Sequence, residues 1–118
     1  MRNQIEQALR TVKPAGITNI HLLALVTGGS SEVVFFGDYE GETVQSNEMA
    51  ERDILKPGVV DRIYQDVKRV VRDSPLFRPG EMNIVTYDEG GEARIRYADR
   101  TQCNRARIKD EWIDSLPQ

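Results

Sequence analysis

Apolar residues recur at helical spacing in three segments of the chain. On a helix, apolar side chains three or four positions apart form one face, and polar side chains fill the rest. The first segment ends before Pro14, the second runs from Pro57 to about Ser74, and the third from Thr101 to Leu116. These segments predict three helices. The apolar residues that mark their faces are Ile5, Ala8, Leu9 and Val12; Val59, Val60, Ile63, Val67, Val70 and Val71; and Ile108, Trp112 and Ile113.

Strand-like segments come in two pairs, and each pair is separated by a glycine-containing turn. The first pair surrounds Gly28–Ser31, and its first member is apolar on both faces, which indicates a buried central strand. The second pair surrounds Asp88–Gly91 and alternates between apolar and polar residues, with Arg94 and Arg96 on one face. The predicted strands are 19–27, 32–38, 81–87 and 92–97, with room for a short additional strand at 42–45.

This order of elements, α-β-β-(β)-α-β-β-α, predicts an α+β fold in which two hairpins build an antiparallel sheet and helices pack against it. A chain of 118 residues fits one hydrophobic core, so we expect a single domain over residues 1–118. No run of about 18 apolar residues predicts a membrane span. The first 13 residues lack the apolar stretch of a secretory signal, so a cytoplasmic protein is expected.

Few residues suggest catalysis. The single cysteine, Cys103, forms no intrachain disulfide, and with the single histidine, His21, it is too little for a zinc site of Cys/His type. The two could act as nucleophile and base, but a strand histidine and a structural thiol are the favoured roles, because no third group orients them. The turn Gly28–Ser31 lacks the lysine of a phosphate loop and leads into a strand. We therefore expect no enzyme activity and no cofactor or metal.

Charge is distributed unevenly along the chain. The net charge is −3, but residues 29–55 carry seven acids and one base, whereas 56–79 carry six bases and three acids. Residues 92–111 add a net charge of +2. Asp38, Glu40 and Glu42 alternate and would share a face in an extended strand. A solvated acidic loop, a metal site and a docking surface for a basic partner are the three hypotheses for this run.

The predicted helix 59–72 carries most of the basic residues of the middle of the chain, namely Arg62, Lys68, Arg69 and Arg72. A nucleic-acid-binding or regulatory module acting through this face is the alternative hypothesis. Asp61, Asp66 and Asp73 interrupt the basic face, and no aromatic residues suited to base stacking are interleaved with it. An ordinary solvated helix surface is therefore the favoured interpretation.

Residues 20–41 (IHLLALVTGGSSEVVFFGDYEG) resemble the first hairpin of the YezG-like antitoxin family. The helix from Ile63 to Asp73 looks like the long helix of that family, and the hairpin around Tyr87–Gly91 is similar to its second hairpin. The stretch Arg105–Ile108 followed by Trp112 resembles its closing arginine-rich segment. The likeness rests on the order of several weak motifs along nearly the whole chain.

The resemblance implies an immunity protein, or antitoxin, that binds and neutralises a cognate bacterial toxin, commonly a nuclease used between competing bacteria. A nuclease presents Lys and Arg to bind phosphates, so an inhibitor can cover that surface with carboxylates. We expect the toxin domain as partner, without direct binding to nucleic acid or membrane. The candidate partner-binding residues are Asp38, Tyr39, Glu40, Glu42, Glu48 and Glu51.

Overall fold

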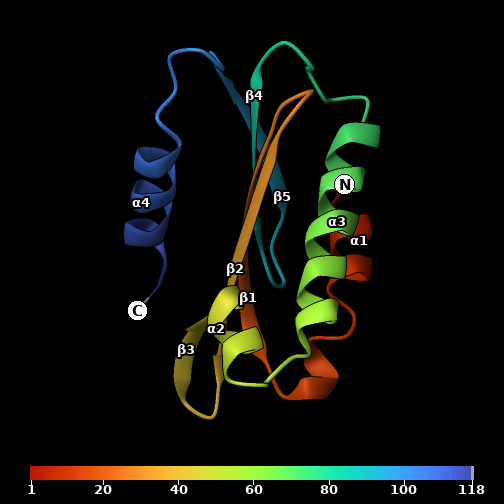
Figure 1. The fold of residues 1–118 in the computed structure, drawn as a ribbon, viewed down its shortest axis with the longest axis vertical. Helices are drawn as coiled ribbons and strands as arrows, with labels where there is room; N and C mark the ends of the chain where they lie inside the picture. Colours follow the sequence, from red (N-terminus) through yellow and green to blue (C-terminus); the bar gives the residue numbers. More distant parts are fainter. Residues whose placement is uncertain (118) are drawn as a thin grey trace.

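A five-stranded antiparallel sheet forms the centre of the protein, seen in a computed structural model that describes residues 1–117 (Figure 1). The strands lie in the order β3-β2-β1-β4-β5. In chain order the elements are α1 (Arg2–Ala8), the 3-10 helix η1 (Lys13–Ala15), β1 (Thr18–Val26), β2 (Ser31–Tyr39), β3 (Glu42–Gln45), α2 (Ser46–Glu51), α3 (Pro57–Asp73), β4 (Met82–Asp88), β5 (Ala93–Ala98) and α4 (Arg105–Ser115).

The predicted α+β class and both predicted hairpins are confirmed. β1 is the central strand: Leu23 lies opposite Val34 of β2 on one side and opposite Thr86 of β4 on the other. Its five residues Leu22–Val26 are buried, which explains why this segment is apolar on both faces. The short strand at 42–45 also forms, as β3 at the edge of the sheet.

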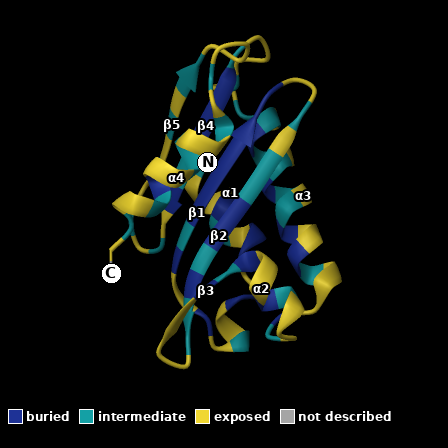
Figure 2. Ribbon diagram, turned by 60° about the vertical axis from the view of Figure 1, so that its left-hand side comes forward, coloured by how far each residue is buried: buried dark blue, intermediate teal, exposed yellow. Residues whose placement is uncertain are grey.

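Helices cover both faces of the sheet, so the protein has three layers (Figures 1 and 2). α1 and α3 lie on one face, where the valine-rich stripe of α3 is buried. α4 lies alone on the other face and covers a smaller cluster. The buried residues of the first layer include Ile5, Leu9, Val12, Leu22, Phe35, Met49, Ile63, Val67 and Val85. Those of the second are Leu23, Leu25, Val34, Met82, Ile84 and Trp112.

Trp112 holds α4 against the sheet. Its side chain is 9% exposed, and its ring centroid lies 5.7 Å from that of Phe36 on β2. The helix begins at Asn104, whose side chain accepts a hydrogen bond of 3.0 Å from the backbone N–H of Arg107. This is an N-cap, which satisfies one of the free N–H groups at a helix start. Trp112, one of the apolar residues that mark the predicted helix face, therefore packs α4 onto the sheet.

Two helical segments differ from the sequence prediction. α1 ends at Ala8, and the chain reaches Val12 through turns rather than continuing the helix. Val12 is still fully buried, so its apolar side chain reflects a place in the core and does not indicate that the helix continues. α2 was not predicted, because six residues with one fully buried apolar side chain, Met49, carry too short an apolar pattern. It forms where Ser46, itself fully buried, hydrogen-bonds through its Oγ to the Tyr64 hydroxyl at 2.6 Å.

Candidate partner-binding surface

The candidate acidic residues come together at one end of the molecule. The β2–β3 turn and α2 lie at the lower end in Figure 1, and the turn is exposed in Figure 2. Because α2 follows β3 directly, the carboxylates of Glu48 and Glu51 lie on the element next to the hairpin that carries Glu40 and Glu42. We call this region, formed by residues 38–53, the acidic end. It contains six acids and one base.

The turn of the hairpin holds Glu40 in an unusual backbone conformation. Tyr39 and Glu42 are paired across the hairpin, so Glu40 and Gly41 form a two-residue turn, with φ values of 51° and 79°. Positive φ at both positions is the type I′ turn, which favours Asn-Gly. A residue with a Cβ pays about 1–2 kcal/mol in this left-handed region. Glutamate is therefore a poor choice for the turn itself.

Left-handed residues other than glycine gather at this end. There are three among residues 1–117: Asn19 (φ 53°), Glu40 and Asp53 (φ 60°). Asn19 precedes the core of β1 and donates from Nδ2 to Asp38 at 2.9 Å. Asp53 follows α2, next to Arg52. Such residues persist where the surroundings hold them, and they concentrate at functional sites.

The alternation expected for Asp38, Glu40 and Glu42 is wrong, because the turn interrupts the extended chain. Asp38 lies opposite Thr43, whereas Glu42 lies opposite Tyr39, so Asp38 and Glu42 point to opposite faces of the sheet. Asp38 accepts hydrogen bonds from Asn19 and from the Thr43 hydroxyl at 3.0 Å. It fastens the ends of β1, β2 and β3 together, and both of its oxygens are engaged in these contacts within the chain.

The remaining carboxylates differ in how free they are. Glu42 pairs with Arg52 at 3.1 Å, which ties the hairpin to the end of α2. Glu40, Glu48 and Glu51 are exposed and make no ion pair with any residue of 1–117. Together with Asp53, which is also exposed and has no ion pair within 1–117, these three carry the available negative charge of the acidic end.

Tyr39 is half-buried and firmly placed. Its ring packs against the core on the α1 side of the sheet, and a Cβ added at Gly16 would lie 3.8 Å from its Cε1 atom. A tyrosine held by its apolar side can present its hydroxyl without losing much conformational entropy, which suits an anchor at an interface.

His21 and Cys103, the two residues considered for catalysis, each contact other parts of the fold. His21 Nδ1 lies 2.6 Å from Asp88 Oδ1 on the neighbouring strand β4. Cys103 packs in the cluster beneath α4. No group of three or more His, Cys, Asp or Glu residues within 1–117 is arranged to hold a metal ion. In the same range, no helix is both long and apolar enough to cross a membrane.

The basic face expected on α3 is broken up by the fold. Arg72 turns inward, and its guanidinium donates to the carbonyls of Thr27 at 3.0 and 3.2 Å and Ser30 at 3.2 Å. Arg69 is paired with Asp66 on the same helix. Arg72 therefore closes the β1–β2 turn onto α3, a role that its position in the basic run did not indicate.

A cavity of about 320 Å³ lies between α1 and the sheet, and it was not predicted. Its lining includes the apolar side chains of Leu9, Val12 and Ile20 and the polar groups of Glu6, Lys13 and Tyr87. The Tyr87 hydroxyl donates to Glu6 at 3.3 Å. Burial, together with the negative charge of Glu6, raises the pKa of Tyr87 to about 12. Arg2, hydrogen-bonded to Glu6, lowers the pKa of that carboxyl.

Neither the protein-family models nor the curated proteins searched contain a match to this sequence.

Proposed function

We propose that this protein is an immunity protein that binds a cognate bacterial toxin, a nuclease, and neutralises it by covering its basic surface with the acidic end. One observation carries the proposal: Glu40, Glu48 and Glu51 are exposed on the β2–β3 turn and on α2, and none has an ion-pair partner within residues 1–117. The resemblance to YezG-like antitoxins motivates the class of partner.

The immunity protein would inhibit the nuclease by occupying the surface that binds its substrate. A nuclease must present a basic groove to the phosphates of its substrate, and carboxylates at the acidic end complement that groove. Tyr39, next to the turn of the hairpin, would supply the amphipathic anchor of the contact. Long-range attraction between the two surfaces can raise the association rate by 10- to 1,000-fold, which matters when a toxin must be trapped before it acts.

The alternative, a nucleic-acid-binding module on α3, receives less support. Arg72 is committed to the carbonyls of the β1–β2 turn, and Arg69 to Asp66. Only Arg62 and the half-buried Lys68 remain of the four residues proposed for that face. Two separated cations supply few phosphate contacts.

The test is co-purification and growth rescue with the C-terminal domain of the toxin encoded next to this gene. The wild-type protein should capture the toxin domain and restore growth of cells that express it. The variant E40K/E48K/E51K should lose both properties. The control D73K/D110K/D114K changes net charge equally on exposed residues of α3 and α4, and it should keep both. Failure of the wild-type protein in both assays would contradict the proposal.

A further inference from the structure

The second edge of the sheet has a different character from the acidic end. β5 pairs only with β4 among the strands of residues 1–117, so its other side is open. It has six residues without proline, glycine or a break in register against β4. β3, at the opposite edge, is four residues long, with a tight turn at its start and α2 directly after its end. Proteins commonly protect edges with short strands, bulges or proline, and β5 has none of these.

An open edge offers backbone groups to a further strand. In an antiparallel sheet, alternate residues of an edge strand direct both N–H and C=O away from the neighbouring strand. No hydrogen bond from another element within 1–117 reaches the backbone of residues 93–98, apart from the ladder to β4. The outward groups of β5 are therefore free for a strand supplied by a partner.

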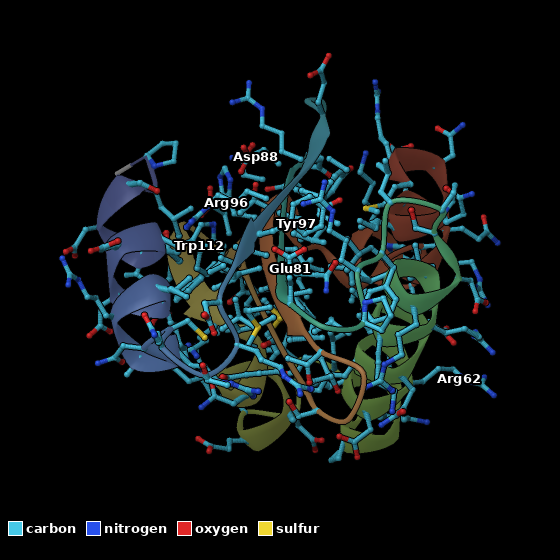
Figure 3. The ribbon with its side chains drawn as sticks, turned by 90° about the horizontal axis from the view of Figure 1, so that it is seen from above. Arg62, Glu81, Asp88, Arg96, Tyr97 and Trp112 are labelled. Atoms are coloured by element: carbon cyan, nitrogen blue, oxygen red, sulfur yellow. The ribbon has the colours of Figure 1, made fainter. Side chains whose placement is uncertain are left out.

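The side chains of β5 specify what such a strand should carry. Arg94 and Arg96 are exposed on the α4 side of the sheet, and neither has an acidic partner in the described part of the chain. Figure 3 shows Arg96 and Tyr97 on opposite sides of the strand. Ile95 and Tyr97 are half-buried on the α1 and α3 side. Arg78 covers the Tyr97 ring at 3.8 Å, and the Tyr97 hydroxyl donates to the carbonyl of Leu76.

We propose that the edge of β5 takes up an extended, acidic peptide segment of a partner protein as a sixth strand. Its backbone would continue the ladder of the sheet. Its carboxylates, at alternate positions, would lie opposite Arg94 and Arg96, with an apolar residue between them beside Ile95. This inference does not depend on the acidic end, because the two surfaces lie at opposite edges of the sheet.

Charge also selects against a second copy of the chain in this position. If two copies paired antiparallel about Ile95, Arg94 of one would lie directly opposite Arg96 of the other, twice. Like charges directly opposite each other across strands are destabilising. The arginines could instead serve only to protect the edge from any pairing, which is a known use of charged side chains. An acidic strand distinguishes these two roles. It adds to β5 if the arginines recruit a partner, and it does not add if they only block pairing.

The direct test uses a synthetic, end-capped peptide of sequence TVEVEVT with the isotope-labelled full-length protein. Amide hydrogen exchange is measured by NMR with and without the peptide. If it adds as a strand, amides of alternate β5 residues should gain protection, and the peptide TVKVKVT should produce no such gain. Absence of protection with TVEVEVT at millimolar concentration would overturn the proposal, as would equal protection by both peptides.

Charge reversal on the protein provides the second arm. In R94E/R96E, two attractive cross-strand pairs become repulsive, so the affinity for TVEVEVT should fall about tenfold, and the variant should prefer TVKVKVT. The control R10E/R62E has the same net charge but leaves β5 untouched, and it should bind TVEVEVT within twofold of wild type. The variant E40K/E48K/E51K should also bind as wild type, which separates this surface from the acidic end. Unchanged preference in R94E/R96E would contradict the pairing.

Discussion

The turn at Glu40 and Gly41 allows a sharp prediction about stability and binding together. Glu40 has a φ of 51°, in a type I′ turn where Asn is strongly preferred at the first position. Replacement of Glu40 by Asn keeps the turn and relieves part of a cost of about 1–2 kcal/mol. We expect Glu40→Asn to increase the free energy of unfolding by about 0.5–1 kcal/mol.

This gain can be measured by urea unfolding, followed through the fluorescence of the single tryptophan, Trp112. For a domain of this size it corresponds to a rise in the midpoint of about 0.5 M. Glu40→Gln is the matched control, because it removes the charge but keeps a side chain poorly suited to positive φ, and its midpoint should stay near wild type. Glu40→Gly should gain less than Asn, since glycine also makes the unfolded chain more flexible.

The same substitutions separate stability from function. Under the proposed role of the acidic end, Glu40→Asn and Glu40→Gln both weaken toxin binding, while only the first stabilises the fold. A variant that is more stable but binds more weakly is the expected pattern for a residue that is kept for binding although it destabilises the fold locally. The reasoning would be refuted if Glu40→Asn were no more stable than Glu40→Gln. A more stable Glu40→Asn variant with unchanged affinity would remove Glu40 from the interface.

Three further predictions concern packing and titration. A Cβ at Gly37 would lie 2.3 Å from Cγ2 of Ile17 and 2.9 Å from Cδ1 of Ile20, so Gly37→Ala should destabilise by about 2–3 kcal/mol. In an Ile17→Ala background, which removes the closer contact, the same change should cost less; additive effects in urea unfolding would contradict this contact. Trp112→Ala removes the anchor between α4 and Phe36 and should cost about 3–5 kcal/mol by denaturation followed by circular dichroism, and a loss below 1 kcal/mol would mean that α4 contributes little. Because the pKa of Tyr87 is raised to about 12 in the folded protein, the unfolded chain loses this proton first, so stability should fall as pH rises from about 10 to 12. Tyr87→Phe should flatten that fall, and an absorbance difference between the two proteins with a midpoint near pH 10 would contradict the shift.

The sheet and its hairpins were predictable because their signals are local. The apolar run at Leu22–Val26 reflects burial on both faces, and the proline at position 57 marks the start of α3. α2 was missed because its formation depends on Ser46 meeting Tyr64, 18 residues away in the chain. No periodic pattern within a short segment records such a contact.

The candidate surface was predictable in composition but not in arrangement. The acidic run was visible as a charge count, yet Asp38 turned out to bind Asn19 and Thr43 rather than face outward. Likewise, the sequence places Arg72 in a basic run, but in the structure its guanidinium donates to the backbone carbonyls of Thr27 and Ser30. No sequence pattern predicts these contacts. Tertiary contacts decide which charges remain available.

The most direct test of the central claim is the association rate of the toxin domain with this protein as a function of salt. With the acidic end as the contact, raising the salt from about 0.05 to 0.5 M should slow wild-type association at least tenfold, because shorter Debye lengths screen the attraction. The variant E40K/E48K/E51K should associate slowly at all salt concentrations, and D73K/D110K/D114K should keep most of the wild-type dependence. Equal rates and equal salt dependence for the wild-type protein and E40K/E48K/E51K would contradict the claim.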